Sequence, residues 1–306
     1  MTISYLLRRL GQSALVLIAL LCLMFVVSNF IGDPVTLLLP PEAPHSQRVA
    51  LAQELGLDKP WYGRFGDYVA RIAAGDFGTS LWLNAPALPL VLTRLPFSLM
   101  LAAITLSIAV PTALILGSLA ALRPKSVVDR MVNFFSLGSV STVDFWIGLM
   151  LILIFAVQLG WFRSGGYGPS YHYVVLPALT MASRPVGRLA QVTRSAMIEE
   201  YSKPYIRMAR AKGMPERRVF LHALKGASIP IVTLGGDEMN HQLNGSVVIE
   251  TVFAWPGIGL LLIQAVQNRD FYLLEATVFV IAVIAIIINL LVDFTYTYLN
   301  PKIKYV

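Results

Sequence analysis

The stretch EEYSKPYIRMARAKGMPERR, residues 199–218, lies between two apolar segments and decides how the chain is organised. Pro204 can begin a short helix, because a proline at the first helical position gives up no intrahelical hydrogen bond. Gly213 can end that helix in a left-handed backbone conformation, and Pro215 can begin the next helix. The small residues in between permit close approach by another protein. We therefore expect a docking surface here, with a basic helix lying on anionic lipid as the alternative.

The composition indicates an integral membrane protein. Hydrophobic residues make up 56% of the 306 residues and charged residues only 13%. The net charge of +7 would favour nucleic-acid binding in a soluble protein, but here it fits the enrichment of Lys and Arg in short cytoplasmic loops. We expect no nucleic-acid partner. Cys22 is the single cysteine, so the chain forms no internal disulfide.

Six apolar segments are long enough to predict membrane-spanning helices. The first exceeds the apolar region of a secretory signal, so we expect it to be retained. The third contains Asp144, and the fourth is interrupted by Arg184 and Arg188. The predicted spans cover residues 10–31, 97–122, 131–161, 171–193, 229–252 and 276–292.

The basic residues set the orientation of these spans. Most of the 24 Lys and Arg residues lie on one side of the membrane, and cytoplasmic loops are the basic ones, so both termini are expected in the cytoplasm. The chain, residues 1–306, is then one transmembrane domain, with an extracytoplasmic insert at 32–96 and a cytoplasmic loop at 196–228.

The extracytoplasmic insert is expected to contain helices. Ser46 can begin a helix that runs to Leu55 and stops at Gly56. Apolar residues that recur at helical spacing then predict one apolar face, which consists of Trp61, Phe65, Val69 and Ile72. We expect this face to pack against the outer ends of the spans, with a separate binding function as the alternative.

The sequence lacks the motifs of ATP hydrolysis and of common hydrolases. A phosphate-binding loop of the form G-x-x-x-x-G-K-[ST] is missing, as are H-E-x-x-H and G-x-S-x-G. An intramembrane enzyme stays an alternative, although it would require a nucleophile and a base that cannot be paired here. We expect no catalytic residue, no bound cofactor and no resident metal.

The docking segment and several further motifs resemble the permeases of binding-protein-dependent ABC importers. The resemblance extends almost end to end, and it is greatest to the dipeptide, oligopeptide and nickel class, where the chain is similar to the first of two permease subunits. The motifs are GDFGTS at 75–80, FWIG at 145–148, LGW at 159–161, ARAKG at 209–213, ETVFAWPGIG at 250–259, NRD at 268–270, NLLVD at 289–293 and NPKI at 300–303.

The resemblance implies a type I permease architecture of six helices in the bacterial inner membrane. A homologous second permease, two ATPase subunits that bind ATP and Mg, and an extracytoplasmic substrate-binding protein are the implied partners. Pro230 matches the proline that ends the family's coupling loop. The residues expected to couple to the ATPase are Tyr205, Arg207, Ala209, Arg210, Ala211, Lys212, Gly213 and Glu216.

Three departures from the family pattern add polar residues to the spans. The third span reads STVDFW at 141–146, where the family has a proline and lacks the acid. The fourth carries its two arginines, and the fifth reads GGDEMNHQLN at 235–244. An ionisable group inside a membrane costs roughly 2.5 to 3.5 kcal/mol, so these groups should face protein, water or one another. At about 1.5 Å of helix rise per residue, the arginines lie at depths comparable to the acids of the fifth span.

We predict that Arg184 or Arg188 pairs with Asp237 or Glu238 in some transport state. Three interpretations stay open: an ion-pair network that fixes the helices or a gate, a substrate pathway, or a nickel site on His241 and Asp237. In a pathway the arginines would suit a carboxylate and the acids an amine. The predicted pathway or gate residues are Asp144, Arg184, Arg188, Asp237, Glu238, Asn240, His241 and Asn244.

The expected substrate is therefore a small peptide or a peptide-like solute. Nickel, opine or glutathione import by a permease of the same class is the alternative. A secondary transporter or channel is a more remote one.

Overall fold

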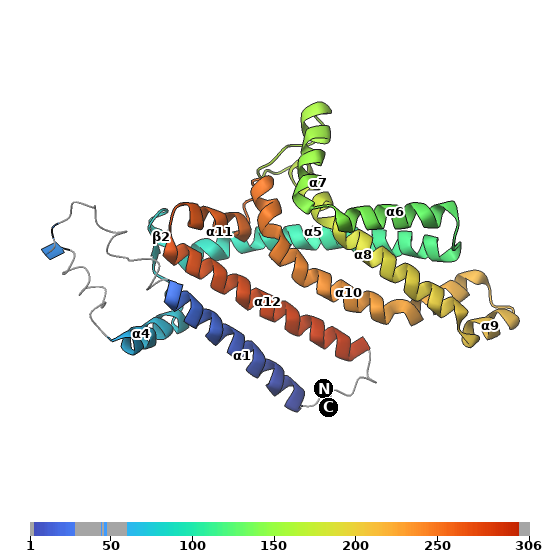
Figure 1. Ribbon diagram of the computed structural model, residues 1–306, viewed down its shortest axis with the longest axis horizontal. Helices are drawn as coiled ribbons and strands as arrows, with labels where there is room; N and C mark the ends of the chain where they lie inside the picture. Colours follow the sequence, from blue (N-terminus) through green and yellow to red (C-terminus); the bar gives the residue numbers. More distant parts are fainter. Residues whose placement is uncertain (1–2, 28–43, 45, 48–59, 300–306) are drawn as a thin grey trace. The chain divides into compact units, whose positions relative to one another are not determined.

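The computed structural model describes residues 3–27, 44, 46–47 and 60–299; of residues 3–7, 240, 243–245 and 294–299 it describes the backbone alone. The end of the predicted first span, the predicted Ser46 helix beyond Gln47, the NPKI motif and both chain ends lie outside it. The elements are α1 (Ile3–Val26), α4 (Trp61–Ala73), β1 (Thr79–Ser80), β2 (Ala85–Pro86), α5 (Ala87–Leu122), α6 (Val127–Ser141), α7 (Asp144–Leu151), the π-helical η2 (Ile152–Gln158), the 3-10 turn η3 (Tyr171–Tyr173), α8 (Val175–Ser202), α9 (Pro204–Ala211), α10 (Glu216–Val252), α11 (Ile258–Gln267) and α12 (Phe271–Leu299) (Figure 1).

The chain is an all-α integral membrane protein, as the composition predicts. Within the described residues, four helices are long and apolar enough to cross a membrane: Arg8–Val26, Ala87–Leu122, Glu216–Met239 and Phe271–Asp293. The pair Val127–Ser141 and Asp144–Gln158 forms a fifth candidate, bent by 106°. The predicted fourth span coincides with α8, which is not among these candidates. A helix or helix pair thus lies at each of the six predicted positions.

The third span is broken, so the prediction of one continuous helix at 131–161 is wrong. Thr142 and Val143 adopt extended backbone conformations, with ψ angles of 141° and 130°. Both residues are β-branched, which lowers helix propensity, and the Thr142 hydroxyl donates to the Gly138 carbonyl at 2.7 Å. Asp144 then begins α7, where its negative charge suits the helix N-terminus. The chain therefore bends here although it lacks the family's proline.

The fifth span begins earlier than predicted. Helix α10 starts at Glu216 and passes through Pro230 without ending, so Pro230 does not mark the end of a loop. Helix α8 likewise continues to Ser202. A proline inside a membrane helix is tolerated because neighbouring helices compensate for its missing donor, as also in α5, which contains Pro96 and Pro111. Most of the 196–228 segment is thus helical.

The structure divides into two compact units, Met1–Thr93 with Leu261–Ile286 and Arg94–Leu260 with Ile287–Val306. In the first unit, α4 forms as predicted and packs on α1, where the Phe25 ring lies 5.2 Å from Phe65 and 5.6 Å from Tyr68. Trp61 is 68% exposed, so it does not belong to the packed face as predicted. A buried Asp270 accepts from the Ser80 hydroxyl at 2.5 Å and from the Leu273 amide at 3.1 Å, which joins the short hairpin to α12.

In the second unit, residues of the ETVFAWPGIG motif connect three helices through hydrogen bonds. The fully buried Glu250 accepts from the Ser98 hydroxyl at 2.6 Å and from the Gly259 amide at 2.7 Å. The backbone amides in the first turn of a helix have no partner within that helix, and the Glu250 carboxylate accepts from those of α11. A carboxylate also suits the positive end of the helix dipole. The Trp255 indole donates to the Phe97 carbonyl at 3.1 Å. These bonds hold α5, α10 and the start of α11 together.

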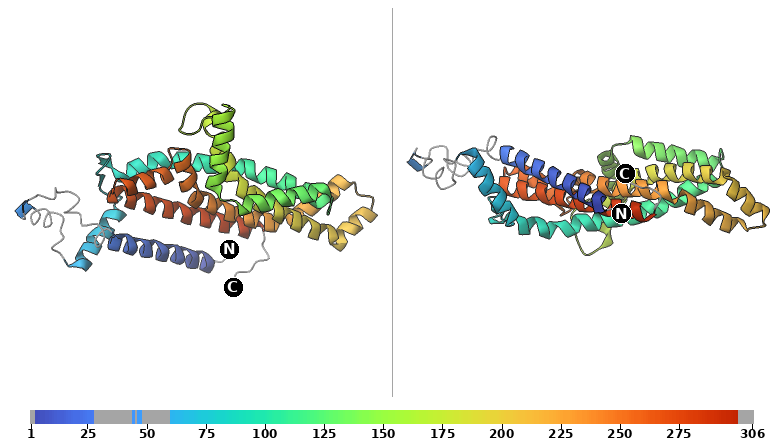
Figure 2. Two further views of the ribbon diagram at one scale, coloured as in Figure 1. Left: turned by 45° about the horizontal axis from the view of Figure 1, so that its top comes forward. Right: turned by 90° about the horizontal axis from the view of Figure 1, so that it is seen from below.

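Helix α8 is the central element of the second unit. It packs along α10 and α6, and it also contacts α7 (Figure 1). Both views of Figure 2 show α6 running alongside α8. Helix α5 also approaches α8 closely at Gly117, where a Cβ would overlap the backbone of Ala190 and the side chain of Thr193. The helices that carry the predicted coupling and pathway residues thus belong to one packed unit.

Candidate functional site

The predicted docking helix is present as α9, between α8 and α10 (Figure 1). Pro204 occupies its first turn, as predicted. Gly213 ends it with a φ of 74°. The Gly213 amide donates to the Arg210 carbonyl at 2.9 Å, and the Met214 amide donates to the Ala209 carbonyl at 3.1 Å. This pair of bonds is the Schellman arrangement, which requires the left-handed residue that glycine supplies without strain.

One side of α9 is anchored in the protein. Ile206 is fully buried and packs in a cluster with Met197 of α8 and with Val219 and Ala223 of α10. Ala209 is half-buried against the same cluster, so it faces the chain's own core more than a partner. The helix is therefore held by α8 and α10 together.

The other side of α9 is exposed and basic. Tyr205 and Met208 are 42% and 60% exposed. The remaining predicted coupling residues are also exposed: Arg207, Arg210, Ala211, Lys212, Gly213 and Glu216. The Arg210 guanidinium donates to the Glu216 carboxylate at 2.8 and 3.1 Å and braces the turn that follows α9. Exposed pairs of this kind contribute little stability, at most about 1 kcal/mol.

A buried carboxylate beneath α9 was not predicted from the sequence. Glu200, near the end of α8, is 7% exposed. It accepts from the Lys203 ammonium at 2.6 Å and from the Tyr205 hydroxyl at 2.5 Å. A Cβ at Gly226 of α10 would overlap this carboxylate. The sequence shows only that an acid precedes Lys203 by three residues and Tyr205 by five. This spacing does not distinguish the buried Glu200 from its exposed neighbour Glu199.

These contacts determine the protonation of the Glu200 site. Burial raises the pKa of Glu200, but hydrogen bonds from Lys203 and Tyr205 outweigh it, so the pKa lies below its ordinary value of 4.5. Burial and the neighbouring carboxylate raise the pKa of Tyr205 to about 12. Folding lowers the pKa of Glu200. Its contribution to the stability of the folded state is therefore present above pH 4.5 and is lost as the pH falls through the folded-state pKa.

We expect Glu200→Gln to loosen α9. A hydrogen bond to a charged group contributes about 1.5 to 3 kcal/mol, so amide exchange in α9 should accelerate by roughly 10- to 100-fold at neutral pH. Hydrogen exchange followed by mass spectrometry measures this. Glu199→Gln is the matched control, because Glu199 is exposed and lies 3.7 Å from Lys203. Equal exchange in the two variants would contradict the anchoring role of Glu200.

The charged residues of the predicted pathway converge from α8 and α10. The Arg188 guanidinium lies 2.6 Å from the Glu238 carboxylate, as an ion pair, and 3.6 Å from that of Asp237. The Glu238 side chain is 2% exposed, whereas that of Asp237 is 53% exposed. The predicted pairing between an arginine of the fourth span and an acid of the fifth is thus present. An exposed Arg184 makes no ion pair within the described residues.

The other predicted pathway residues surround this pair. Asp144, at the start of α7, interacts electrostatically with Arg184, and one of its oxygens is buried without a hydrogen-bond partner. His241 is exposed and interacts electrostatically with Glu238. The side chains of Asn240 and Asn244 lie outside the described part of the chain. The structure therefore brings charged groups of α7, α8 and α10 together. We call these residues the charged cluster: Asp144, Arg184, Arg188, Asp237, Glu238 and His241.

Gln242 joins the same two helices and was not among the predicted residues. It is buried, and its amide donates to the Met181 carbonyl of α8 at 3.1 Å. Its place in the polar run GGDEMNHQLN of the fifth span was the available signal in the sequence.

Comparison with known sequences identifies the family. The profile described as "Binding-protein-dependent transport system inner membrane component" matches residues 113–305. The chain belongs to this family. Among its relatives are the oligopeptide transport system permease protein AppB of Bacillus subtilis and the di/tripeptide transport system permease protein DppB of Pseudomonas aeruginosa, each 34% identical over 99% of both chains. The glutathione transport system permease protein GsiC of Salmonella typhimurium is 36% identical over 99% of both chains.

Membership of the inner membrane component family fits the architecture. This chain is a multi-pass membrane permease and a transport subunit rather than an enzyme. The family match begins within α5 and includes α6 to α12, so it covers both α9 and the charged cluster.

Proposed function

We propose that this chain is the first of two permease subunits in an ATP-driven importer of small peptides or peptide-like solutes. The observation that carries the proposal is α9, a short helix anchored by Ile206 and Glu200 that presents an exposed basic face. This face would dock on an ATPase subunit. In this proposal two ATPases bind ATP and Mg, this chain binds no cofactor, and a second permease completes the pathway. A substrate-binding protein delivers the solute from outside.

The proposed arrangement in the bacterial inner membrane has both termini in the cytoplasm. Residues 1–306 then form one permease domain, with the extracytoplasmic insert at 32–96 and the coupling loop at 196–228. The basic surface of α9 supports this orientation, because cytoplasmic segments are the basic ones.

The charged cluster supports a peptide as the substrate. The relatives are named for oligopeptides, di- and tripeptides, and glutathione, all of which carry amine and carboxylate groups. Arg184 and Asp237 expose opposite charges on neighbouring helices, α8 and α10. Together they suit a zwitterion. The buried Glu238 favours a second role for the same cluster, as an ion-pair network that fixes the helices or a gate.

Reconstitution tests the proposed function. The chain should be co-expressed with its proposed ATPases and second permease, placed in proteoliposomes and supplied with the binding protein. We expect uptake of di- and tripeptides that requires ATP, and no ATP hydrolysis by the purified chain alone. Peptide uptake without ATPase subunits would contradict the importer class. Uptake of Ni²⁺ or of an opine in place of peptides would keep the class and exclude the peptide substrate.

A further inference from the structure

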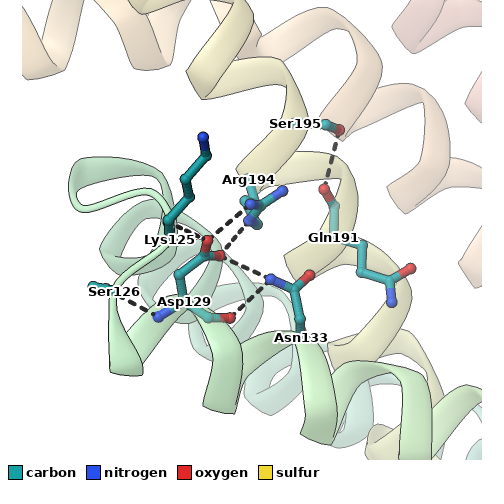
Figure 3. A network of polar contacts seen from close by, with 7 residues as sticks. All are labelled: Lys125, Ser126, Asp129, Asn133, Gln191, Arg194 and Ser195. Atoms are coloured by element: carbon teal, nitrogen blue, oxygen red, sulfur yellow. Dashed lines mark hydrogen bonds and ion pairs between the residues drawn. The ribbon is translucent and has the colours of Figure 1, made fainter.

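A second buried carboxylate, remote in sequence from the coupling helix, joins α6 to α8 (Figure 3). Asp129 is 3% exposed and forms a two-point ion pair with the Arg194 guanidinium, one nitrogen of which lies at 2.9 Å. It also accepts from the Lys125 backbone amide and from the Asn133 side chain, both at 2.8 Å. The Ser126 hydroxyl accepts from the Asp129 amide at 3.2 Å and begins α6. Each oxygen of the Asp129 carboxylate thus accepts hydrogen bonds from groups of this chain.

The same two helices touch again two turns away. A Cβ at Gly187 of α8 would overlap the Ser139 hydroxyl and the Ser136 carbonyl of α6. From Asp129 to Ser136 α6 advances by about 10 Å, and from Arg194 to Gly187 α8 runs the same distance in the opposite chain direction. Two close contacts at this separation oppose sliding and rotation of the helices against each other. Helices α6 and α8 are therefore a rigid pair.

The Asp129–Arg194 contact lies on α8 between the cluster residue Arg188 and the start of α9. The α8 member of the rigid pair leads through Lys203 directly into α9. The α6 member ends at the extended residues Thr142 and Val143, after which α7 begins with Asp144. The bend between α6 and α7 is thus the place at which a movement of α6 would reach Asp144 of the charged cluster.

We propose that Asp129 and Arg194 are positioning residues that make α6 move with α8, so that displacement of α9 reaches the bend before α7. The inference rests on the proposed coupling function of α9. Neither residue contacts the exposed face of α9 or the charged cluster, so their effect is transmitted through the helices. Without the ion pair, α8 would move while α6 lagged behind it.

Distances between spin labels test the rigid pair in the complete transporter. Labels on Leu137→Cys in α6 and Ser195→Cys in α8, both exposed positions, are introduced with Cys22→Ser so that no other thiol of this chain reacts. We expect the same distance distribution without nucleotide and with nucleotide trapped on the ATPases by vanadate. A distribution that changes between the two states would overturn the proposal. The labelled chain keeps the native ion pair, so the measurement does not depend on the folding of a variant that lacks this pair.

Substitution of the ion pair tests its role in coupling. In Asp129→Asn or Arg194→Gln the label distance should become dependent on nucleotide, and peptide imported per ATP hydrolysed should fall by roughly tenfold, within the range usual for coupling between sites. The two substitutions combined should lose no more than the more severe single one, because they remove one interaction. Arg194→Lys, which keeps the charge but not the two-point geometry, should recover part of the ratio.

Arg130→Gln is the matched control, since Arg130 is the exposed neighbour of Asp129 on α6. It should leave the transport ratio and the label distances unchanged. If Asp129→Asn and Arg194→Gln both import as much peptide per ATP hydrolysed as the wild type, the proposal is overturned. Absence of peptide uptake by the unaltered transporter would count against the proposed function alone, because the distance measurement requires only nucleotide binding.

Discussion

Gly213→Leu should insert and accumulate normally in the membrane and lose most of its transport. Gly213 has a φ of 74°, and a left-handed conformation costs a residue with a β-carbon about 1 to 2 kcal/mol. That penalty alone shifts the equilibrium of the docking turn by roughly 5- to 30-fold. A leucine side chain at this exposed position would also separate α9 from the ATPase surface. Peptide uptake and stimulated ATP hydrolysis in proteoliposomes measure the loss.

Gly213→Ala separates the two contributions, because it adds the backbone strain but little bulk. We expect it to retain intermediate transport. Gly66→Leu is the matched control, since Gly66 lies exposed in α4 with open space around its Cα. Full transport by Gly213→Leu at wild-type abundance would exclude α9 as the docking element. An equal loss in the Gly66 variant would attribute the defect to insertion instead.

Local rules were sufficient to predict α9. A proline that begins a helix and a glycine that ends it act through their own backbone, so Pro204 and Gly213 could be assigned from the sequence. The same rules gave wrong boundaries where tertiary contacts dominate. Pro230 does not end α10, because helices packed around it compensate for its missing hydrogen bond. The break at Thr142 was missed because apolar composition does not report backbone direction.

The charged cluster was predicted better than the buried carboxylates. Ionisable residues in apolar segments must find partners, and helix rise placed Arg188 and Glu238 at similar depth, so their pairing could be predicted. The partners of Glu200, Asp129 and Glu250 depend on packing between helices. No spacing rule along one helix relates Ser98 to Glu250.

Replacement of Glu238 by leucine should destabilise the protein by about 3 to 5 kcal/mol, because it leaves the Arg188 guanidinium without its closest partner in a membrane helix. Arg188→Met should have a comparable effect, since it strands a carboxylate that is 2% exposed. Arg188→Met combined with Glu238→Leu should be milder than the sum, because no charge is left unpaired. Thermal unfolding of the purified chain in nanodiscs measures each variant.

Asp237→Asn is the control for this cycle. Asp237 lies 3.6 Å from the same guanidinium but is 53% exposed, so its removal should cost at most about 1 kcal/mol. Additive losses from Arg188→Met and Glu238→Leu would contradict a shared ion pair. A large loss from Asp237→Asn would instead make that residue the main partner of Arg188.

The dependence of uptake on peptide charge then separates a substrate pathway from a structural network. Arg184 is exposed and outside the ion pair, so Arg184→Gln should leave thermal stability unchanged. If Arg184 binds a peptide carboxylate, this variant should reduce uptake of a free dipeptide more than uptake of its C-terminal amide. A network that only fixes the helices makes no contact with the solute. Equal reduction for both peptides would therefore assign the cluster to the gate.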